Sequence, residues 1–291
     1  MQFVANVGVL AGVVVCLGLA GVPGGAPRVA ASDTPVVPNV TPDGEVAVLL
    51  SIQLAVAEHG AETLRGGAAV PKLLELLGAQ EAWVHEEALR LLSAIAGRAF
   101  REAAEAEAFW DEAHGAELTL ERALAAEQLE SGAAAIFYPN LDLAGPGMAE
   151  VRPSIYCQEG GAPVAGGGRE FSSRWIARLC VPAAGDYELR AWVDDGARVW
   201  IDGRLVLDEW AYRGEYRSIG RLHLTEGLHT VYVEHYDSGG PAALVFEWRQ
   251  GKAAEFVRVP WTLFRTGPGA AQALQRVVDA WGRVPEQLLG P

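Results

Sequence analysis

Two adjacent carboxylates, Asp194 and Asp195, stand directly before Gly196 in a stretch that otherwise alternates between apolar and polar residues like a β-hairpin. Carboxylates can hold a cation or transfer a proton, and a pair of them does so only when both groups reach one target. Neighbouring side chains of a regular strand point to opposite faces of the sheet. Either the two aspartates have separate roles, or the backbone between them departs from a regular strand.

Catalysis by this pair is not expected. Glycosidases place two carboxylates about 5 to 9 Å apart on either side of the substrate, and adjacent residues do not provide that geometry. Nothing in the sequence distinguishes Glu209, Glu215 or Glu234 as a second carboxylate. Because nucleophile elbows, phosphate-binding loops and zinc-ligand spacings are also missing from the sequence, we predict that the protein is not an enzyme.

His229 and His235 lie on the same face of a segment with a period of two. Along a strand they would be about 20 Å apart, which is too far for both to bind one metal ion. We therefore expect both histidines to be ordinary sheet residues.

Charge and composition exclude a nucleic-acid-binding surface. The chain has 291 residues, a net charge of −14 and only two lysines, Lys72 and Lys252. Nucleic-acid binding needs clustered positive charge instead. Half of the residues are apolar, as is typical of globular proteins, and the length suits one or two domains.

The first charged side chain after the start is Arg28, and the preceding run, residues 1–25, is apolar and rich in small residues. Val29 and Ala31 are the small residues that a signal peptidase requires before Ser32. A cleaved signal peptide at residues 1–31 is one interpretation, and an uncleaved membrane anchor is the other, since residues 3–22 are about long enough to span a bilayer. Both predict a secreted, periplasmic or cell-surface protein, with membrane contact only through this segment if it is uncleaved.

The two cysteines that follow this segment, Cys157 and Cys180, would meet an oxidising environment in an exported protein and could form a disulfide. The alternative is two buried, unpaired thiols, because the sequence does not show whether the two Cβ atoms meet. Both interpretations stay open.

Helices are expected after a proline-rich linker at residues 32–44. From residue 45 to about 130 the apolar period is helical, with two apolar faces formed by Val70, Leu73, Leu74 and Leu77 and by Val84, Ala88, Leu91, Leu92 and Ile95. The part at about 45–115 is similar to a HEAT-type helical repeat, which implies a protein partner docked through the helices. A small helical spacer or docking bundle is the alternative, since repeats need several units for stability.

Strands are expected in residues 135–265. The apolar period falls to two in six segments, WIARLCV, YELRAWV, ARVWI, RLVLD, TVYVEHY and AALVFEW. Asp202-Gly203 is a two-residue hairpin signal, and the whole predicts an antiparallel sandwich or barrel. Residues 266–291 are expected to contain a C-terminal helix. The fold class is therefore a multidomain α and β protein, in which a small helical region precedes an antiparallel β-sandwich.

The order of motifs at about residues 136–250 resembles the protective-antigen (PA-fourteen) domain family. The matching features are an aromatic RW strand, a P-x-x-G-x-Y turn, the run DDG-x-R-x-W-I-D-G followed by an aspartate and a tryptophan, and G-x-H-x-V-x-V-E. The resemblance implies a β-sandwich of the kind found in secreted adhesins, toxins and glycosidases. Several members, including yeast flocculins, bind sugars through calcium.

In those members a cis peptide bond joins the paired aspartates and turns both carboxylates to one side. The resemblance implies the same for Asp194 and Asp195. An asparagine in the later hairpin loop completes the protein ligands there, and this chain has Asp237 at that position. The resemblance therefore implies a calcium site at these three aspartates, to which Ser238 and Gly239 could lend backbone carbonyls.

Two functions follow from these observations. The first is an exported, non-catalytic module that binds a glycan or another cell-surface ligand through calcium. In this module Tyr212 and Tyr216 lie in a loop and stack on sugar rings, while Trp210 anchors the hairpin in the core. The second is a structural or protein–protein interaction domain of a larger cell-envelope assembly, in which one aspartate caps a turn and the other pairs with an arginine such as Arg198.

Overall fold

The computed structural model describes residues 44–64, 68–158, 170–212, 216–239, 243–253 and 255–290. The predicted signal peptide or anchor at residues 1–31 lies outside this part, and so does nearly all of the 32–44 linker. In the part that is described, no helix is both long and apolar enough to cross a membrane. Residues Pro35–Pro291 form one compact unit.

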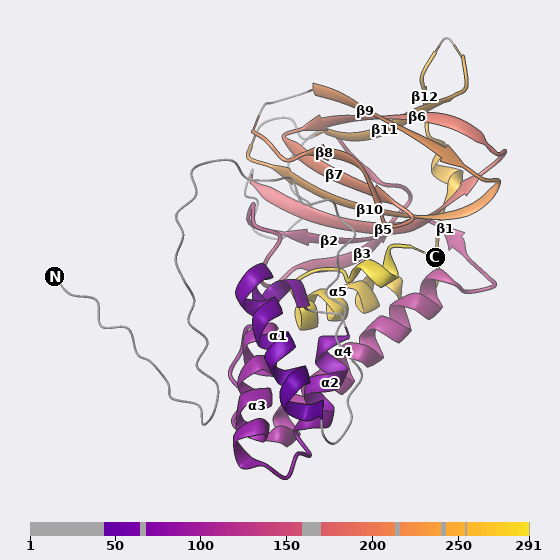
Figure 1. Ribbon diagram of the computed structural model, residues 1–291. Coiled ribbons are helices and arrows are strands. Elements are labelled where there is room, and N and C mark those ends of the chain that lie inside the picture. Colours follow the sequence, from indigo (N-terminus) through magenta and orange to yellow (C-terminus); the bar gives the residue numbers. More distant parts are fainter. Residues whose placement is uncertain are drawn as a thin grey trace, which may run out of the picture. The chain divides into compact units, whose positions relative to one another are not determined.

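Helices form the N-terminal part of the described chain (Figure 1). They are α1 (Glu45–His59), α2 (Ala69–Leu76), α3 (Ala82–Ala96) and α4 (Ala103–Leu124), with a short 3-10 helix, η2, at Ala61–Leu64. The predicted apolar faces are the faces that pack, since Leu73 and Leu91 are fully buried. A helix with an apolar stripe must bury that stripe against a neighbour, which is why these helices pair.

The strands form two antiparallel sheets, which we call sheet A and sheet B. In sheet A the order is β1-β13-β5-β10-β7-β8, with β2 on β5 and β3 on β2; in sheet B it is β12-β11-β6-β9, with β4 on β11. Their bounds are β1 (Glu130–Ser131), β2 (Ala133–Tyr138), β3 (Met148–Arg152), β4 (Tyr156–Gln158), β5 (Phe171–Val181), β6 (Gly185–Asp194), β7 (Gly196–Ile201), β8 (Arg204–Glu209), β9 (Tyr216–Leu224), β10 (Gly227–Asp237), β11 (Ala243–Gln250), β12 (Val257–Arg258) and β13 (Phe264–Thr266). The predicted order, a helical region followed by an antiparallel β-sandwich, is confirmed.

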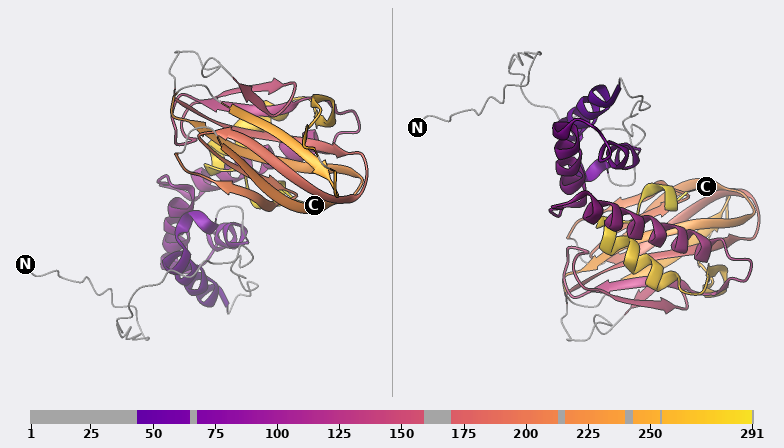
Figure 2. Two further views of the ribbon diagram at one scale, coloured as in Figure 1. Left: turned by 90° about the horizontal axis from the view of Figure 1, so that it is seen from above. Right: turned by 90° about the horizontal axis from the view of Figure 1, so that it is seen from below.

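Sheet A is buried on both faces at β2. On β2, Ala135 and Phe137 belong to the core between the two sheets, whereas Ile136 and Tyr138 belong to the core beneath the helices. The helix α5 (Ala270–Trp281) packs on β2, β3 and α4, and Figure 2 shows α4 and α5 lying across this sheet. The C-terminal segment continues into a short 3-10 helix, η4 (Glu286–Leu288). The helical region and the sandwich therefore share a core.

The hairpin predicted at Asp202-Gly203 joins β7 to β8. Ile201 is opposite Arg204, so two residues make the turn. Both have positive φ, 47° for Asp202 and 74° for Gly203, as a type I′ turn requires. Five of the six predicted strand segments lie in β5, β6, β7, β8 and β10, and the sixth lies in β11 from Ala243 onward, since Ala242 is outside the described residues.

The disulfide considered between Cys157 and Cys180 is not formed, and both thiols are free. Cys180 on β5 is opposite Leu228 near the start of β10. Cys157 on β4 lies near the other end of β10: its thiol is close enough to Asp237, the last residue of β10, for that carboxylate to raise the pKa of the thiol. Asp237 lies nine positions after Leu228 on β10, a distance of about 30 Å, so the two sulfurs cannot meet. Unpaired thiols are the interpretation that holds.

Candidate functional site

The adjacent aspartates lie where the chain crosses from one sheet to the other. Asp194 is the last residue of β6 and is opposite Ala243 in sheet B. Gly196 is the first residue of β7 and is opposite Tyr236 in sheet A. β6 and β7 are therefore not partners in a hairpin, although their alternation suggested one. We call residues 194–196 the crossing.

The peptide bond between Asp194 and Asp195 is cis, as the family resemblance implies. The backbone N–H of Asp195 donates to the carbonyl of Tyr236 at 3.0 Å, which ties the crossing to the end of β10. Gly196 is required next, because an added Cβ would lie 2.2 Å from the Tyr236 ring. The sequence DDG thus fits a position where two backbones and an aromatic ring pack closely.

Residues of the loop after β10 donate hydrogen bonds to two of the three predicted ligand carboxylates, those of Asp195 and Asp237. Ser238 donates to Oδ2 of Asp195 from its backbone N–H at 2.9 Å and from its hydroxyl at 2.5 Å. The backbone N–H of Gly239 donates to Oδ1 of Asp237 at 2.6 Å. Ser238 and Gly239 act here as donors to the aspartates, while their predicted role as carbonyl ligands stays a prediction.

Asp237 retains one carboxylate oxygen with no hydrogen-bond partner in the described residues. This atom, Oδ2, is buried, and the whole side chain is 1 % exposed. Burial raises the pKa of Asp237, the Gly239 N–H lowers it, and the negative charge of Asp195 raises it again. Asp194 and Asp195 are buried too. A bound cation would stabilise the buried carboxylates of Asp195 and Asp237, which repel each other.

The oxygen donors at the crossing are of the chemical type that calcium binds. Within the described residues, no group of three His, Cys, Asp or Glu side chains is arranged to hold a metal ion by itself. Calcium takes six to eight oxygens and accepts backbone carbonyls, waters and ligand hydroxyls among them. A cation at the crossing would use the carboxylates together with such oxygens.

His235 contacts the crossing, which the sequence did not lead us to expect. Its ring is fully buried, and its Nε2 lies 3.0 Å from the carbonyl oxygen of Asp194, to which it donates. Burial lowers the pKa of His235 to about 4, so the ring is neutral at pH 7. The signal was a histidine at an inward position of an apolar strand, because such a side chain needs a buried polar partner.

The predicted aromatic residues lie at the same end of the sandwich as the crossing. Glu209 at the end of β8 is opposite Ala197, and Tyr216 at the start of β9 is opposite Val193. Tyr212, between these strands, is 79 % exposed. Tyr216 begins a strand and is not part of the predicted loop, and its side chain lies outside the described residues.

Trp210 has the anchoring role that was expected. Its ring packs on that of Tyr236, with centroids 4.8 Å apart, and the guanidinium of Arg198 lies 4.6 Å from the Trp210 centroid. The indole therefore covers the ring against which Gly196 packs.

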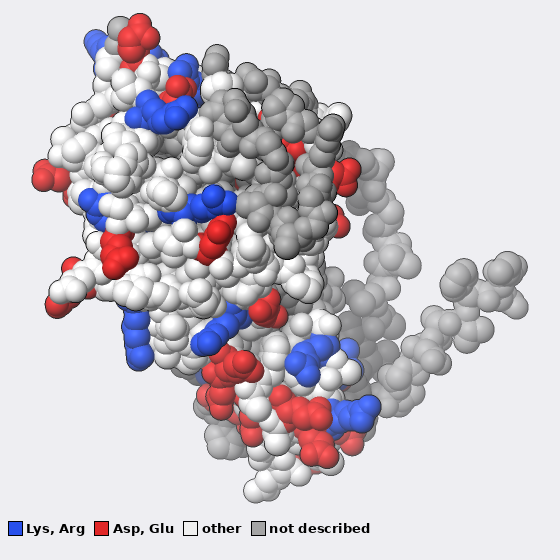
Figure 3. Space-filling model, turned by 180° about the vertical axis from the view of Figure 1, so that it is seen from behind, with Lys and Arg blue, Asp and Glu red and all other residues white. Residues whose placement is uncertain are grey.

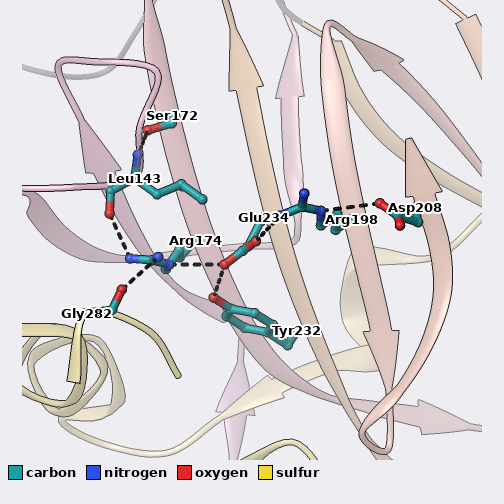
Figure 4. Close-up of polar contacts among 8 residues, drawn as sticks. All are labelled: Leu143, Ser172, Arg174, Arg198, Asp208, Tyr232, Glu234 and Gly282. Atoms are coloured by element: carbon teal, nitrogen blue, oxygen red, sulfur yellow. Dashed lines mark hydrogen bonds and ion pairs between the residues drawn. The ribbon is translucent and has the colours of Figure 1, made fainter. Parts of the chain in front are cut away.

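Arg198 forms ion pairs with Asp208 and Glu234, at 3.3 and 3.5 Å, and not with an aspartate of the crossing (Figure 4). Glu234 also lies 3.4 Å from Nε of Arg174 and accepts a hydrogen bond from the Tyr232 hydroxyl at 2.9 Å. Among the described residues, Arg198 is therefore not the arginine partner that the structural alternative suggested, whereas the turn-capping role in that alternative agrees with the hydrogen bond that Asp195 accepts from the Ser238 N–H. The partners of Arg198 come instead from the neighbouring strands β8 and β10.

The family resemblance of the β region is confirmed. Residues 129–259 match the family model described as the PA14 domain. The similarity of the helical region to HEAT-type repeats stays a prediction.

One curated relative is the anti-sigma-I factor RsgI3 of Acetivibrio thermocellus, which is 30% identical over 81 residues. That alignment covers 27% of this chain and 13% of the relative, so the chain corresponds to a small part of that protein. The solved structure of an anti-sigma factor domain-containing protein matches with a TM-score of 0.43 and 23% identity, over 46% of this chain and 48% of the other.

A second solved structure that matches is described as the PA14 sugar-binding domain from an RTX adhesin. Its TM-score is 0.37 and its identity 19%, and the match covers 47% of this chain and 98% of that domain.

Proposed function

We propose, from the PA14 domain at residues 129–259, that this chain is a non-catalytic binding module that recognises a glycan or another surface ligand through calcium. Asp194, Asp195 and Asp237 would hold the ion. The observation that supports this most directly is Oδ2 of Asp237, which is buried without a partner in the described residues and lies near the charge of Asp195. A buried carboxylate in that position costs free energy unless a cation or a proton neutralises it.

The ligand would bind at the end of the sandwich that carries the crossing. Calcium keeps coordination positions that sugar hydroxyls can occupy. The strand register brings both ends of the segment between β8 and β9 to this end, and the exposed ring of Tyr212 belongs to that segment. An exposed aromatic ring offers a face for stacking on a sugar. The RTX adhesin domain, described as sugar-binding, supports this ligand class.

We also propose that the module works outside the cytoplasm. Residues 1–31 have the apolar, small-residue pattern of an export signal or anchor. A glycan ligand at a cell surface is consistent with that location.

A second candidate function is protein binding within a regulatory or envelope assembly. It is favoured by the identity to an anti-sigma-I factor over 81 residues. In this case the sandwich would present a protein-binding surface, and the helices would be available as a second contact surface. The metal titration below separates the two candidates, because protein binding of this kind does not require calcium.

The decisive experiment is a calorimetric calcium titration of the full chain. We expect saturable binding by the wild type and at least tenfold weaker binding by Asp194→Ala. The matched control is Asp208→Asn. It removes a carboxylate on β8 of sheet A that pairs with Arg198, and this variant should bind calcium like the wild type. An absent calcium response in the folded wild type would contradict the proposal.

The sugar is tested separately. A glycan array is probed with the wild type in calcium and then in chelator. Glycan binding that disappears in chelator supports recognition through the ion. Binding that persists unchanged would show that the ligand is recognised without the metal.

A further inference from the structure

A cavity of about 360 Å³ lies among the helices, formed by side chains of α2, α4, α5 and η4. It is separate from the crossing, because none of its lining residues comes from a strand. The residues that line it include Trp110, Trp281, Val70, Leu74 and Glu117. This volume is in the range of small-molecule sites.

The sequence of α4 brings the polar and aromatic groups of this cavity together. Trp110, His114 and Glu117 are spaced i, i+4 and i+7, so they lie on one face of the helix. The ring of Trp110 meets that of Trp281 from α5, with centroids 4.6 Å apart. The two indoles form one aromatic wall beside the carboxyl group.

Glu117 is the unusual residue of this wall. It is 8 % exposed, and its Oε1 is buried without a hydrogen-bond partner in the described residues. Its other oxygen, Oε2, accepts a hydrogen bond from Gln287 Nε2 at 3.4 Å and lies 3.8 Å from His114 Nδ1. Burial raises the pKa of Glu117, against smaller opposing effects of Gln287 and His114. Burying a carboxylate with one unpartnered oxygen costs free energy, which a bound cation would offset.

The surroundings of the cavity are negative. Asp111 and Glu117 line it, and the described lining residues include no lysine or arginine. The helical region as a whole carries more acidic than basic residues, and in Figure 3 acidic side chains gather on that part of the visible face. Such a field attracts cations and repels anions.

We propose that this cavity binds a small organic ammonium ion. Its N–H groups donate to the carboxylate of Glu117, and its apolar body packs against Trp110 and Trp281. Indole faces attract cations through their electron-rich π systems, and a carboxylate in a partly dry site supplies the opposite charge and the hydrogen-bond acceptor. A neutral ligand of the same shape would leave the carboxylate without its counter-charge.

The test is a calorimetric titration of the full chain with phenethylammonium, and with 2-phenylethanol as the neutral ligand of similar shape. We expect saturable binding of the ammonium ion and at least tenfold weaker binding of the alcohol. Glu117→Gln keeps the side-chain shape and should weaken ammonium binding at least tenfold. The matched control is Glu121→Gln, which makes the same change one turn further along α4 at an exposed position and should change nothing.

Thermal unfolding of the same variants without ligand provides a second measurement. Glu117→Gln should melt at the same or a higher temperature than the wild type, since it removes a desolvated charge. A lower melting temperature would show that the carboxylate stabilises the fold and would overturn the proposal. Equal binding of the alcohol, unchanged binding by Glu117→Gln, or no saturable binding by the wild type would each overturn it too. Binding should be the same in calcium and in chelator, so its outcome is independent of the crossing.

Discussion

In the candidate calcium site, Asp237 combines a buried, unpartnered carboxylate oxygen with repulsion from the charge of Asp195. Asp237→Asn keeps one oxygen ligand and removes the buried charge. In chelator this variant should be more stable than the wild type by about 1 kcal/mol, the usual size of such effects. In calcium the order should reverse, because the wild type gains binding free energy that the variant largely loses.

Urea unfolding of both proteins, in calcium and in chelator, measures this. A variant that is clearly less stable than the wild type in chelator would mean that the negative charge of Asp237 is satisfied within the protein.

His235 supports the crossing through its hydrogen bond to the Asp194 carbonyl. His235→Phe fills the space but leaves that carbonyl without its donor, which should cost about 1–3 kcal/mol. The control is His223→Phe on β9, an exposed position where the change should stay within about 0.5 kcal/mol. Both are measured by urea unfolding, and equal effects of the two substitutions would contradict the supporting role of His235.

Glu117 predicts a pH dependence with a definite sign. Its folded-state pKa is raised, so its contribution favours folding below the unfolded-state pKa and is lost as the pH rises through the folded-state pKa. Glu117→Gln has no such loss. We expect the variant to exceed the wild type in stability at pH 7 and the difference to shrink as the pH falls toward 4. Urea unfolding at both pH values checks this, and a difference that grows on acidification would contradict it.

Among the secondary-structure elements, α5 depends on one arginine of the sheet. Nη2 of Arg174 donates to the carbonyl of Gly282 at the end of α5 at 3.2 Å, and Nη1 donates to the Leu143 carbonyl at 2.9 Å. Arg174→Met would leave both carbonyls and the carboxylate of Glu234 without this donor. Removing one partner of such a buried network should cost about 3–5 kcal/mol.

Hydrogen exchange locates the effect of Arg174→Met. The amides of α5 should lose protection before those of β11 do. Arg204→Met, at an exposed position of β8, is the control and should leave both unchanged. Equal loss of protection throughout the chain would argue against a specific link between Arg174 and α5.

The period of apolar residues predicted most of the elements, and β9 shows where that signal fails. Gly220 interrupts the alternation of this strand. A glycine is needed there, because an added Cβ would lie 2.3 Å from a methyl carbon of Val206. This requirement comes from the close approach of β8, a tertiary contact that the apolar period within one segment cannot reveal. The same holds for Cys157 and Cys180, since only the folded structure shows that Cys180 lies near the start of β10 and Cys157 near Asp237 at its end.

The candidate calcium site could be predicted only in part. The order of motifs identified Asp194, Asp195 and Asp237, because a family pattern preserves spacing along the chain. It could not show that Ser238 and Gly239 donate to these carboxylates or that His235 lies under the crossing, since both depend on side-chain packing across strands. Glu117 was missed for the same reason, because a glutamate on an alanine-rich helix suggests a solvated face until the packing partner is known.

For the molecule as a whole, the shared core predicts cooperative unfolding. The outer face of sheet A, including Ile136, Ile176 and Tyr232, belongs to the same apolar cluster as the helices. Helical circular dichroism and tryptophan fluorescence should therefore give coincident urea transitions. Loss of the helical signal at a lower urea concentration would show that the helices unfold independently of the sandwich.

The paired strands β1 and β13 determine the direction in which a force applied to a bound ligand would load the sandwich. The chain enters the sandwich at Glu130 and leaves it at Thr266, and these two residues are opposite each other. β13 pairs with β5 at Arg178, whereas the other end of β5, at Phe171, is opposite Asp237. Tension between a ligand at the crossing and the rest of the chain would run lengthwise along β5 and β10. Because the ladder hydrogen bonds lie across that direction, they would be loaded in shear together and not opened one by one.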